Sequence, residues 1–164
     1  MKRLLLLAVG WAGVAWVLRP SKLKSLPYAQ IIESAGRKHN VDPRLIASII
    51  KIESNFDTDA IGDGGTSFGL MQVNCTATLT GRLSTARVMG YRGACLDLLI
   101  PSIGIDIGTA YLAKQIKRYQ DQGYYNIEIP VVAYNTGSAF TADHRLKTGT
   151  NNYAKRVMAF YRTL

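Results

Sequence analysis

The sequence contains few of the side chains that usually bind metals or act as catalytic nucleophiles. Its 164 residues include only two histidines and two cysteines. His39 and His144 are far apart in the sequence, and neither Cys75 nor Cys95 has a histidine or cysteine at metal-ligand spacing. We therefore expect no metal site, and no serine–histidine or cysteine–histidine arrangement indicates a nucleophilic triad.

Acidic residues are also scarce. The chain has 11 Asp and Glu against 20 Lys and Arg, which gives a formal net charge of +9. Five basic residues and no acidic residue occur in the first 24 positions, so the remainder carries only about +4. No segment interleaves basic with aromatic residues, which argues against nucleic-acid binding. A mildly basic domain is compatible with an anionic cell envelope.

One apolar segment, Leu4–Leu18, follows Lys2 and Arg3. A helix of this length covers about 22 Å, less than the roughly 30 Å of a bilayer core, which favours a signal peptide. Trp11 and Trp16 are nevertheless suited to a membrane interface, so an uncleaved inner-membrane anchor through residues 4–18 stays open. The basic flanks argue against a buried core helix. In either case we expect export to the periplasm or cell envelope.

Export would place the two cysteines in an oxidising compartment. A disulfide between Cys75 and Cys95 would close a loop of about 20 residues and stabilise the fold by about 3 kcal/mol in the chain-entropy model. The alternative is a pair of buried free thiols. We expect the disulfide.

The hydrophobic pattern predicts a mostly α fold without internal repeats. Asp42-Pro43 is a strong helix start, because it combines a capping acid with proline at the first helical position. The polar, glycine-rich loop 55–67 shows little β-propensity, and the pattern at 78–97 indicates an irregular segment with room for one helical turn. We expect a signal peptide or anchor plus linker at residues 1–24 and one domain at 25–164. The predicted helices cover about 27–39, 43–54, 69–77, 101–122, 130–137 and 151–164.

Glu53 lies on the apolar face of the predicted helix 43–54. A carboxyl group in apolar surroundings has a raised pKa, and the nearby carbonyl end of the helix acts in the same direction. A carboxyl that stays protonated near neutral pH is what a general acid for glycosidic cleavage requires. The alternative is a glutamate paired with a buried Arg or Lys. The apolar arc contains Leu45, Ile46, Ile49, Ile50, Ile52 and Phe56.

Several short motifs occur in a characteristic order after this helix. They are Glu53-Ser54, the GLMQ sequence at 69–72, the AYNTG sequence at 133–137, Asn152-Tyr153-Ala154, and a central helix pattern at 103–119. Together they resemble the lytic transglycosylase family, which has a lysozyme-like fold. The resemblance extends from about Tyr28 to Tyr161. Each motif alone is weakly specific, whereas their order and spacing are strongly specific.

The resemblance implies that Glu53 is the single catalytic acid and base. It further implies that Gln72 hydrogen-bonds sugar, that Met71 forms an apolar wall, and that Tyr134 and Asn135 lie at the floor of the site. The hydroxyl of Tyr153 would lie near the catalytic carboxyl, and no cofactor or metal is implied. Purely structural roles stay open for Leu70, Met71 and Tyr134 as core residues, and for Asn135 as a helix-end residue.

The loop before GLMQ departs from the family pattern. Many relatives carry a substrate-contacting serine there, and the nearest equivalents in this chain are Asp63 and Ser67. The same run resembles the loop of goose-type lysozymes, in which carboxylates assist hydrolysis. Asp63 is therefore either a second catalytic carboxylate or a turn residue in an Asp-Gly pair that contacts sugar.

The expected substrate is the peptidoglycan glycan strand, cleaved at the β-1,4 bond between N-acetylmuramic acid and N-acetylglucosamine with a 1,6-anhydromuramoyl product. A lysozyme-type hydrolase of the same bond is one alternative. A non-catalytic peptidoglycan-binding assembly component, tethered through residues 4–18, is another. The chain also resembles small transglycosylases of secretion and conjugation machines and of phages, so these machineries are candidate partners. No nucleic-acid partner is expected.

Overall fold

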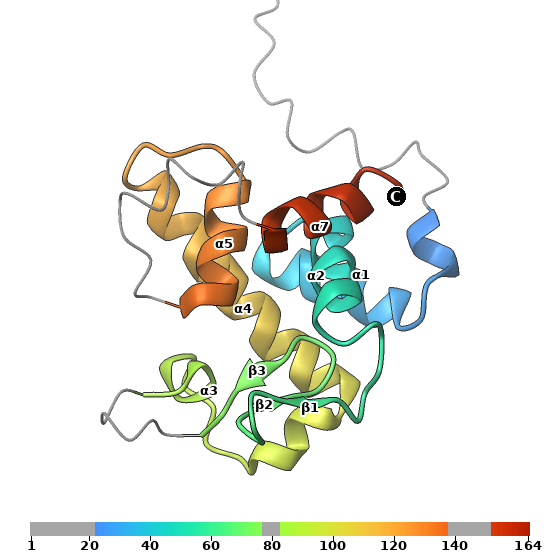
Figure 1. Ribbon diagram of the computed structural model, residues 1–164, viewed down its shortest axis with the longest axis vertical. Helices are drawn as coiled ribbons and strands as arrows, with labels where there is room; N and C mark the ends of the chain where they lie inside the picture. Colours follow the sequence, from blue (N-terminus) through green and yellow to red (C-terminus); the bar gives the residue numbers. More distant parts are fainter. Residues whose placement is uncertain (1–21, 77–82, 138–151) are drawn as a thin grey trace, which may run out of the picture.

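The computed structural model describes residues 22–76, 83–137 and 152–164, and in these residues the chain is mostly helical, as predicted (Figure 1). The apolar segment 4–18, predicted as a signal peptide or anchor, and His144 lie outside the described residues. Within the described ranges, no helix has the length and apolar character needed to cross a membrane.

Helices come first along the chain, a small sheet follows, and further helices, including the long α4, come after it. Their bounds are η1 Lys22–Ser25, α1 Ala29–His39, α2 Pro43–Glu53, β1 Ile61–Gly62, β2 Ser67–Phe68, β3 Val73–Asn74, α3 Thr85–Val88, η2 Cys95–Leu99, α4 Pro101–Gln120, α5 Glu128–Thr136 and α7 Asn152–Tyr161.

Helix α2 begins as its sequence predicts. The Asp42 side chain accepts a hydrogen bond of 2.9 Å from the Arg44 backbone N–H, and Pro43 occupies the first helical position. Ile46, Ile49 and Ile50 are fully buried, so the predicted apolar face of α2 is the centre of the core. Helix α2 ends at Glu53, and Asn55 and Phe56 follow it with positive φ.

Helix α4 runs through the middle of the molecule, between α5 on one side and the sheet on the other (Figure 1). It packs against α1, α5 and η2. Ile105 and Leu112 on this helix have no exposed surface. The long helix therefore links the core under α2 to the part of the chain that carries the sheet.

The small antiparallel sheet was not expected. Its strand order is β1-β2-β3, with Ile61 opposite Phe68 and Phe68 opposite Val73. The predictions of a strand-free loop at 55–67 and a short helix at 69–77 are wrong. Gly69 at φ 70° and Gln72 at φ 46° form a turn that reverses the chain between β2 and β3. Strands of two residues are too short for apolar alternation to be recognised in the sequence.

A disulfide joins Cys75, just after β3, to Cys95 at the start of η2. Its Cα–Cα distance is 5.6 Å and its sequence separation is 20 residues. The bond closes the segment that contains α3, which carries few buried side chains of its own. A covalent link at this place limits the freedom of that segment in the unfolded chain.

The packed part of the chain includes residues before the predicted boundary at position 24. Leu23 in η1 is only 4% exposed, and η1 contacts α1 and α2. Burying a leucine side chain stabilises a fold by about 1.5–3 kcal/mol.

We therefore predict that a chain starting at Lys22 is more stable than one starting at Ser25, by about 2 kcal/mol. Urea unfolding followed by circular dichroism measures the difference. Leu23→Ala in the longer chain should reproduce most of the loss, whereas Lys24→Ala, at an exposed position, should not. Equal unfolding midpoints for the two chains would contradict the contribution of Leu23.

Candidate active site

Glu53 is the last residue of α2, and its side chain is partly buried. The Tyr153 hydroxyl, from the first turn of α7, donates a hydrogen bond of 2.6 Å to Glu53 Oε1. Burial raises the pKa of Glu53 to about 7; the Tyr153 hydrogen bond opposes this shift, the charge of Asp63 adds to it, and the charge of Arg156 opposes it. The carboxyl group is thus held near its titration midpoint at neutral pH.

Tyr153 reaches this carboxyl from a point 100 residues further along the chain. Burial and the nearby charge of Glu53 raise the pKa of Tyr153 well above its ordinary value. The hydroxyl therefore stays protonated and acts as a hydrogen-bond donor. A donor at this place stabilises the ionised form of Glu53 more than the neutral form.

Ser54, next to Glu53, ties the end of α2 to the GLMQ turn. Its hydroxyl donates to the Leu70 carbonyl at 2.9 Å and, more weakly, to the Ile50 carbonyl at 3.2 Å. The sequence motif included Ser54 but gave it no role of its own. The structure places it as the link between the helix that carries Glu53 and the loop beside it.

Met71 and Tyr134 form a buried centre beneath the site. The Tyr134 hydroxyl donates to the Met71 carbonyl at 2.8 Å, and the Met71 side chain has no exposed surface. Met71 thus packs in the core, as the structural alternative held, and Tyr134 is a core aromatic with a satisfied hydroxyl. Gly108 on α4 was missed: a Cβ there would lie 2.7 Å from Met71 Sδ. Asn135, one residue after Tyr134, is exposed.

Gln72 is bonded mainly to backbone. Its amide nitrogen donates to the carbonyls of Ala60 and Gly69, both at 3.0 Å. Its amide oxygen lies so close to Gly62 that a Cβ there would come within 2.2 Å of it. Gln72 therefore holds β1 against the GLMQ turn, and its oxygen is the atom left for a further hydrogen bond.

Asp63 and Ser67 form a pair in the β1–β2 hairpin. The buried Ser67 hydroxyl donates to Asp63 Oδ2 at 2.6 Å. Asp63 is exposed, with φ 51°, and sits in the turn where Thr66 donates to its carbonyl. Its charge is near enough to raise the pKa of Glu53. The hairpin thus brings both carboxyl groups to the same region.

One groove lies away from these residues, and the described residues contain no metal-binding cluster. A groove of about 630 Å³ between α1 and α4, lined partly by Ile31 and Ile103, contains none of the predicted site residues. In the described part of the chain, no group of three or more His, Cys, Asp and Glu side chains is arranged to hold a metal ion.

Comparison with known proteins identifies the family of this chain. Residues 30–157, well over half of the chain, match the family described as the transglycosylase SLT domain. The endo-type membrane-bound lytic murein transglycosylases A of Salmonella paratyphi B and Salmonella typhimurium are each 37% identical to this chain over 92 residues. These alignments cover 55% of this chain and 43% of each relative, so the match spans less than half of their length.

A solved structure shares the fold. It is an inactive mutant of the lytic transglycosylase Slt from Pseudomonas aeruginosa, with a TM-score of 0.62 and 22% sequence identity. The match covers 82% of this chain and 24% of that chain. At this identity the likeness concerns the arrangement of the backbone.

The raised pKa of Glu53 predicts a pH-dependent stability. Between its ordinary value of 4.5 and about 7, the folded chain holds a proton that the unfolded chain has lost. Stability therefore falls as pH rises through this window and is level above it. Glu53→Gln removes the titration, so it should be more stable than the wild type at pH 8, by up to about 3 kcal/mol, and nearly equal to it at pH 4.

Urea unfolding of both proteins at pH 4 and pH 8 measures this difference. Glu33→Gln, on α1 and outside the site, controls for the loss of one negative charge. A gain from Glu53→Gln that is the same at both pH values would show that burial does not perturb this carboxyl.

Proposed function

Because this chain belongs to the transglycosylase SLT domain family, we propose that it cleaves peptidoglycan glycan strands at the β-1,4 bond between N-acetylmuramic acid and N-acetylglucosamine. The observation that carries the proposal is the partly buried carboxyl of Glu53, which has a pKa of about 7 and a tyrosine donor on one oxygen. A general acid needs a pKa near the working pH to give up its proton and later accept another.

Glu53 first protonates the glycosidic oxygen, and the C–O bond to the leaving sugar breaks. The substrate's own N-acetyl group stabilises the cation that forms at the anomeric carbon. The ionised Glu53 then accepts the proton of the muramoyl 6-hydroxyl, whose oxygen attacks that carbon. The product is a 1,6-anhydro sugar, and no water is consumed.

Tyr153 acts on the form of Glu53 that exists between the two steps. Its hydroxyl donates to Glu53 Oε1, so it stabilises the carboxylate that exists between the two proton transfers. Because this bond opposes the effect of burial, it keeps the pKa of Glu53 from rising further. Gln72 and Asn135 are the proposed sugar contacts, together with the Asp63–Ser67 pair. Met71 and Tyr134 shape the floor from below.

The protein is proposed to act outside the cytoplasm, in the periplasm or cell envelope. A disulfide between Cys75 and Cys95 suits an oxidising compartment. The Salmonella relatives are described as membrane-bound. Residues 4–18 are the proposed membrane contact if they are not removed, and secretion, conjugation or phage machinery are the proposed partners.

We predict that Glu53→Gln folds and binds glycan but loses cleavage by at least about 10²-fold, because no other carboxyl replaces the acid. Release of soluble fragments from purified cell walls measures the rate, and binding of the variant to the same walls is the control for folding. More than a tenth of wild-type turnover in Glu53→Gln would remove Glu53 from the reaction.

The second candidate function is hydrolysis by water, favoured by the charge of Asp63 near Glu53. Asp63 occupies an exposed glycine-rich turn, and a loosely held base activates water poorly. We therefore predict less than a tenfold loss of rate in Asp63→Asn, with anhydro-muropeptides, each one water lighter than the hydrolysed form, in the mass spectrum of the wild-type digest. Reducing-end sugars and an inactive Asp63→Asn would instead assign the chain to the hydrolases.

A further inference from the structure

The hydrogen bond on Glu53 depends on where α7 lies. Helix α7 packs against α2 (Figure 1), and the hydrogen bonds at its two ends show that it runs in the opposite direction to α2. Tyr153, at the start of α7, meets Glu53 at the end of α2, whereas Tyr161, at the end of α7, meets Asp42 just before α2. Tyr153 and Tyr161 are eight residues apart and lie on the same side of the helix, about 12 Å from each other.

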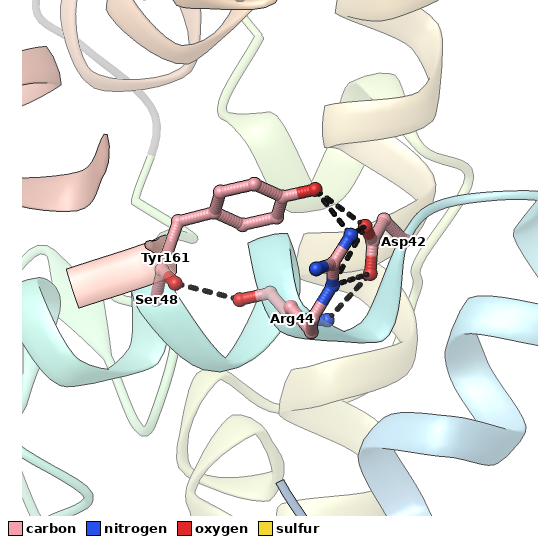
Figure 2. A network of polar contacts seen from close by, with 4 residues as sticks. All are labelled: Asp42, Arg44, Ser48 and Tyr161. Carbon is pink, nitrogen blue, oxygen red and sulfur yellow. Dashed lines mark hydrogen bonds and ion pairs between the residues drawn. The ribbon is translucent and has the colours of Figure 1, made fainter. Parts of the chain in front are cut away.

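Figure 2 shows the contacts at the second of these ends. The Tyr161 hydroxyl donates to Asp42 Oδ2 at 2.7 Å and accepts from the Arg44 guanidinium at 2.6 Å. The same guanidinium nitrogen donates to Asp42 Oδ2 at 2.7 Å, so the three groups form a closed triangle. The guanidinium carbon also lies 4.6 Å from the centre of the Tyr161 ring. We call Asp42, Arg44 and Tyr161 the anchor cluster.

The anchor cluster is charge-assisted and partly shielded from water. Burial alone would raise the pKa of Asp42, but the hydrogen bonds from Arg44 and Tyr161 outweigh it and hold the pKa below its ordinary value. Asp42 and Arg44 side chains are 25% and 34% exposed, respectively. Hydrogen bonds to ionised groups are shorter and stronger than neutral ones. Ser48, one turn further along α2, donates to the Arg44 carbonyl at 2.6 Å.

The anchor cluster therefore links α7 to α2 in addition to capping α2. Asp42 accepts from the Arg44 backbone N–H to start α2, and the same carboxyl holds the end of α7. The Asp42 carboxyl thus fixes the end of α7 relative to the start of α2. Val157, halfway between the two tyrosines, is fully buried in the core. Apolar packing is non-directional, so it restrains the separation of two helices more than their sliding along one another. Directional bonds at both ends can restrain that sliding.

We propose that the anchor cluster is a positioning site, which holds the far end of α7 so that the Tyr153 hydroxyl stays on Glu53. Its importance for cleavage rests on the proposed function. The positioning itself does not, because it can be measured on the titration of Glu53 without any substrate.

The test is a double-mutant cycle of Tyr161→Phe and Tyr153→Phe, with the titration of the Glu53 carboxyl followed by carbon-13 NMR in the folded protein. Tyr161→Phe keeps the ring over Arg44 and removes only the hydroxyl. Loosening of α7 should weaken the Tyr153 donor, so the pKa of Glu53 should rise by about 0.3 or more, a twofold change in proton affinity. Tyr153→Phe should raise it further, and the double variant should match Tyr153→Phe alone.

Ile32→Val is the control, because it removes volume from the buried side of α1, at a position outside α2 and α7, and lowers the unfolding temperature. It should leave the titration of Glu53 unchanged. The other groups whose charges influence Glu53 or sit against it, Asp63, Arg156 and Tyr134, are the same in all variants.

Three results would overturn the proposal. They are an unchanged titration in Tyr161→Phe, shifts that simply add in the double variant, or an equal shift in Ile32→Val. Absence of glycan cleavage by the wild type would instead reject the proposed function and leave the positioning result standing. If both hold, Tyr161→Phe should lower kcat at least twofold with little change in KM, and its pH–rate profile should move with the titration.

Discussion

The hydrogen bond between the Tyr153 hydroxyl and Glu53 Oε1 joins the first turn of α7 to the last residue of α2 across 100 residues of chain. Two opposing influences meet on that carboxyl. Burial disfavours its charge, and the tyrosine donor favours it, with a net pKa of about 7. A fully buried carboxyl without the donor would hold its proton too tightly to release it, and an exposed one would lose it well below neutral pH. The packing of α7 on α2 maintains this balance between burial and the Tyr153 hydrogen bond, because a shift of about 1 Å in either helix would change it.

The support beneath Glu53 consists largely of side chains that bond to backbone. The Ser54 hydroxyl donates to the Leu70 carbonyl and the Tyr134 hydroxyl to the Met71 carbonyl. The Gln72 amide donates to the carbonyls of Ala60, just before β1, and Gly69. Such bonds fix the path of the chain without depending on what the neighbouring side chain is. The close approach of α4 has a separate cause, because Gly108 has no side chain and leaves space for Met71. Met71 and Tyr134 therefore act mainly as buried support beneath Glu53, and fewer of the motif side chains are left free for other contacts than the motif suggests.

Much of the helical frame could be predicted from the sequence. Asp42-Pro43 marked the start of α2, the apolar period placed Glu53 on the inner face, and proline marked the start of α4. These signals are local, because capping and periodicity depend on residues within one or two turns. The sheet was missed for the converse reason. Its two-residue strands are specified by pairing with each other and by turns at positive φ, and the 69–77 segment, with its apolar residues, was mistaken for a helix.

The sequence by itself determined the fold class, the family resemblance and the position of Glu53 on the apolar face of α2, since each follows from composition, local period or short motifs. Only the tertiary structure decided what surrounds that carboxyl. The roles of Ser54 and Gly108, the burial of Met71 and the antiparallel contact of α2 with α7 all involve residues that are distant in sequence or contacts made through backbone atoms. A local sequence pattern does not indicate which distant residues will be in contact. The tertiary structure also decided the pKa of Glu53, because the burial of this carboxyl and the Tyr153 donor exist only after α7 has packed on α2.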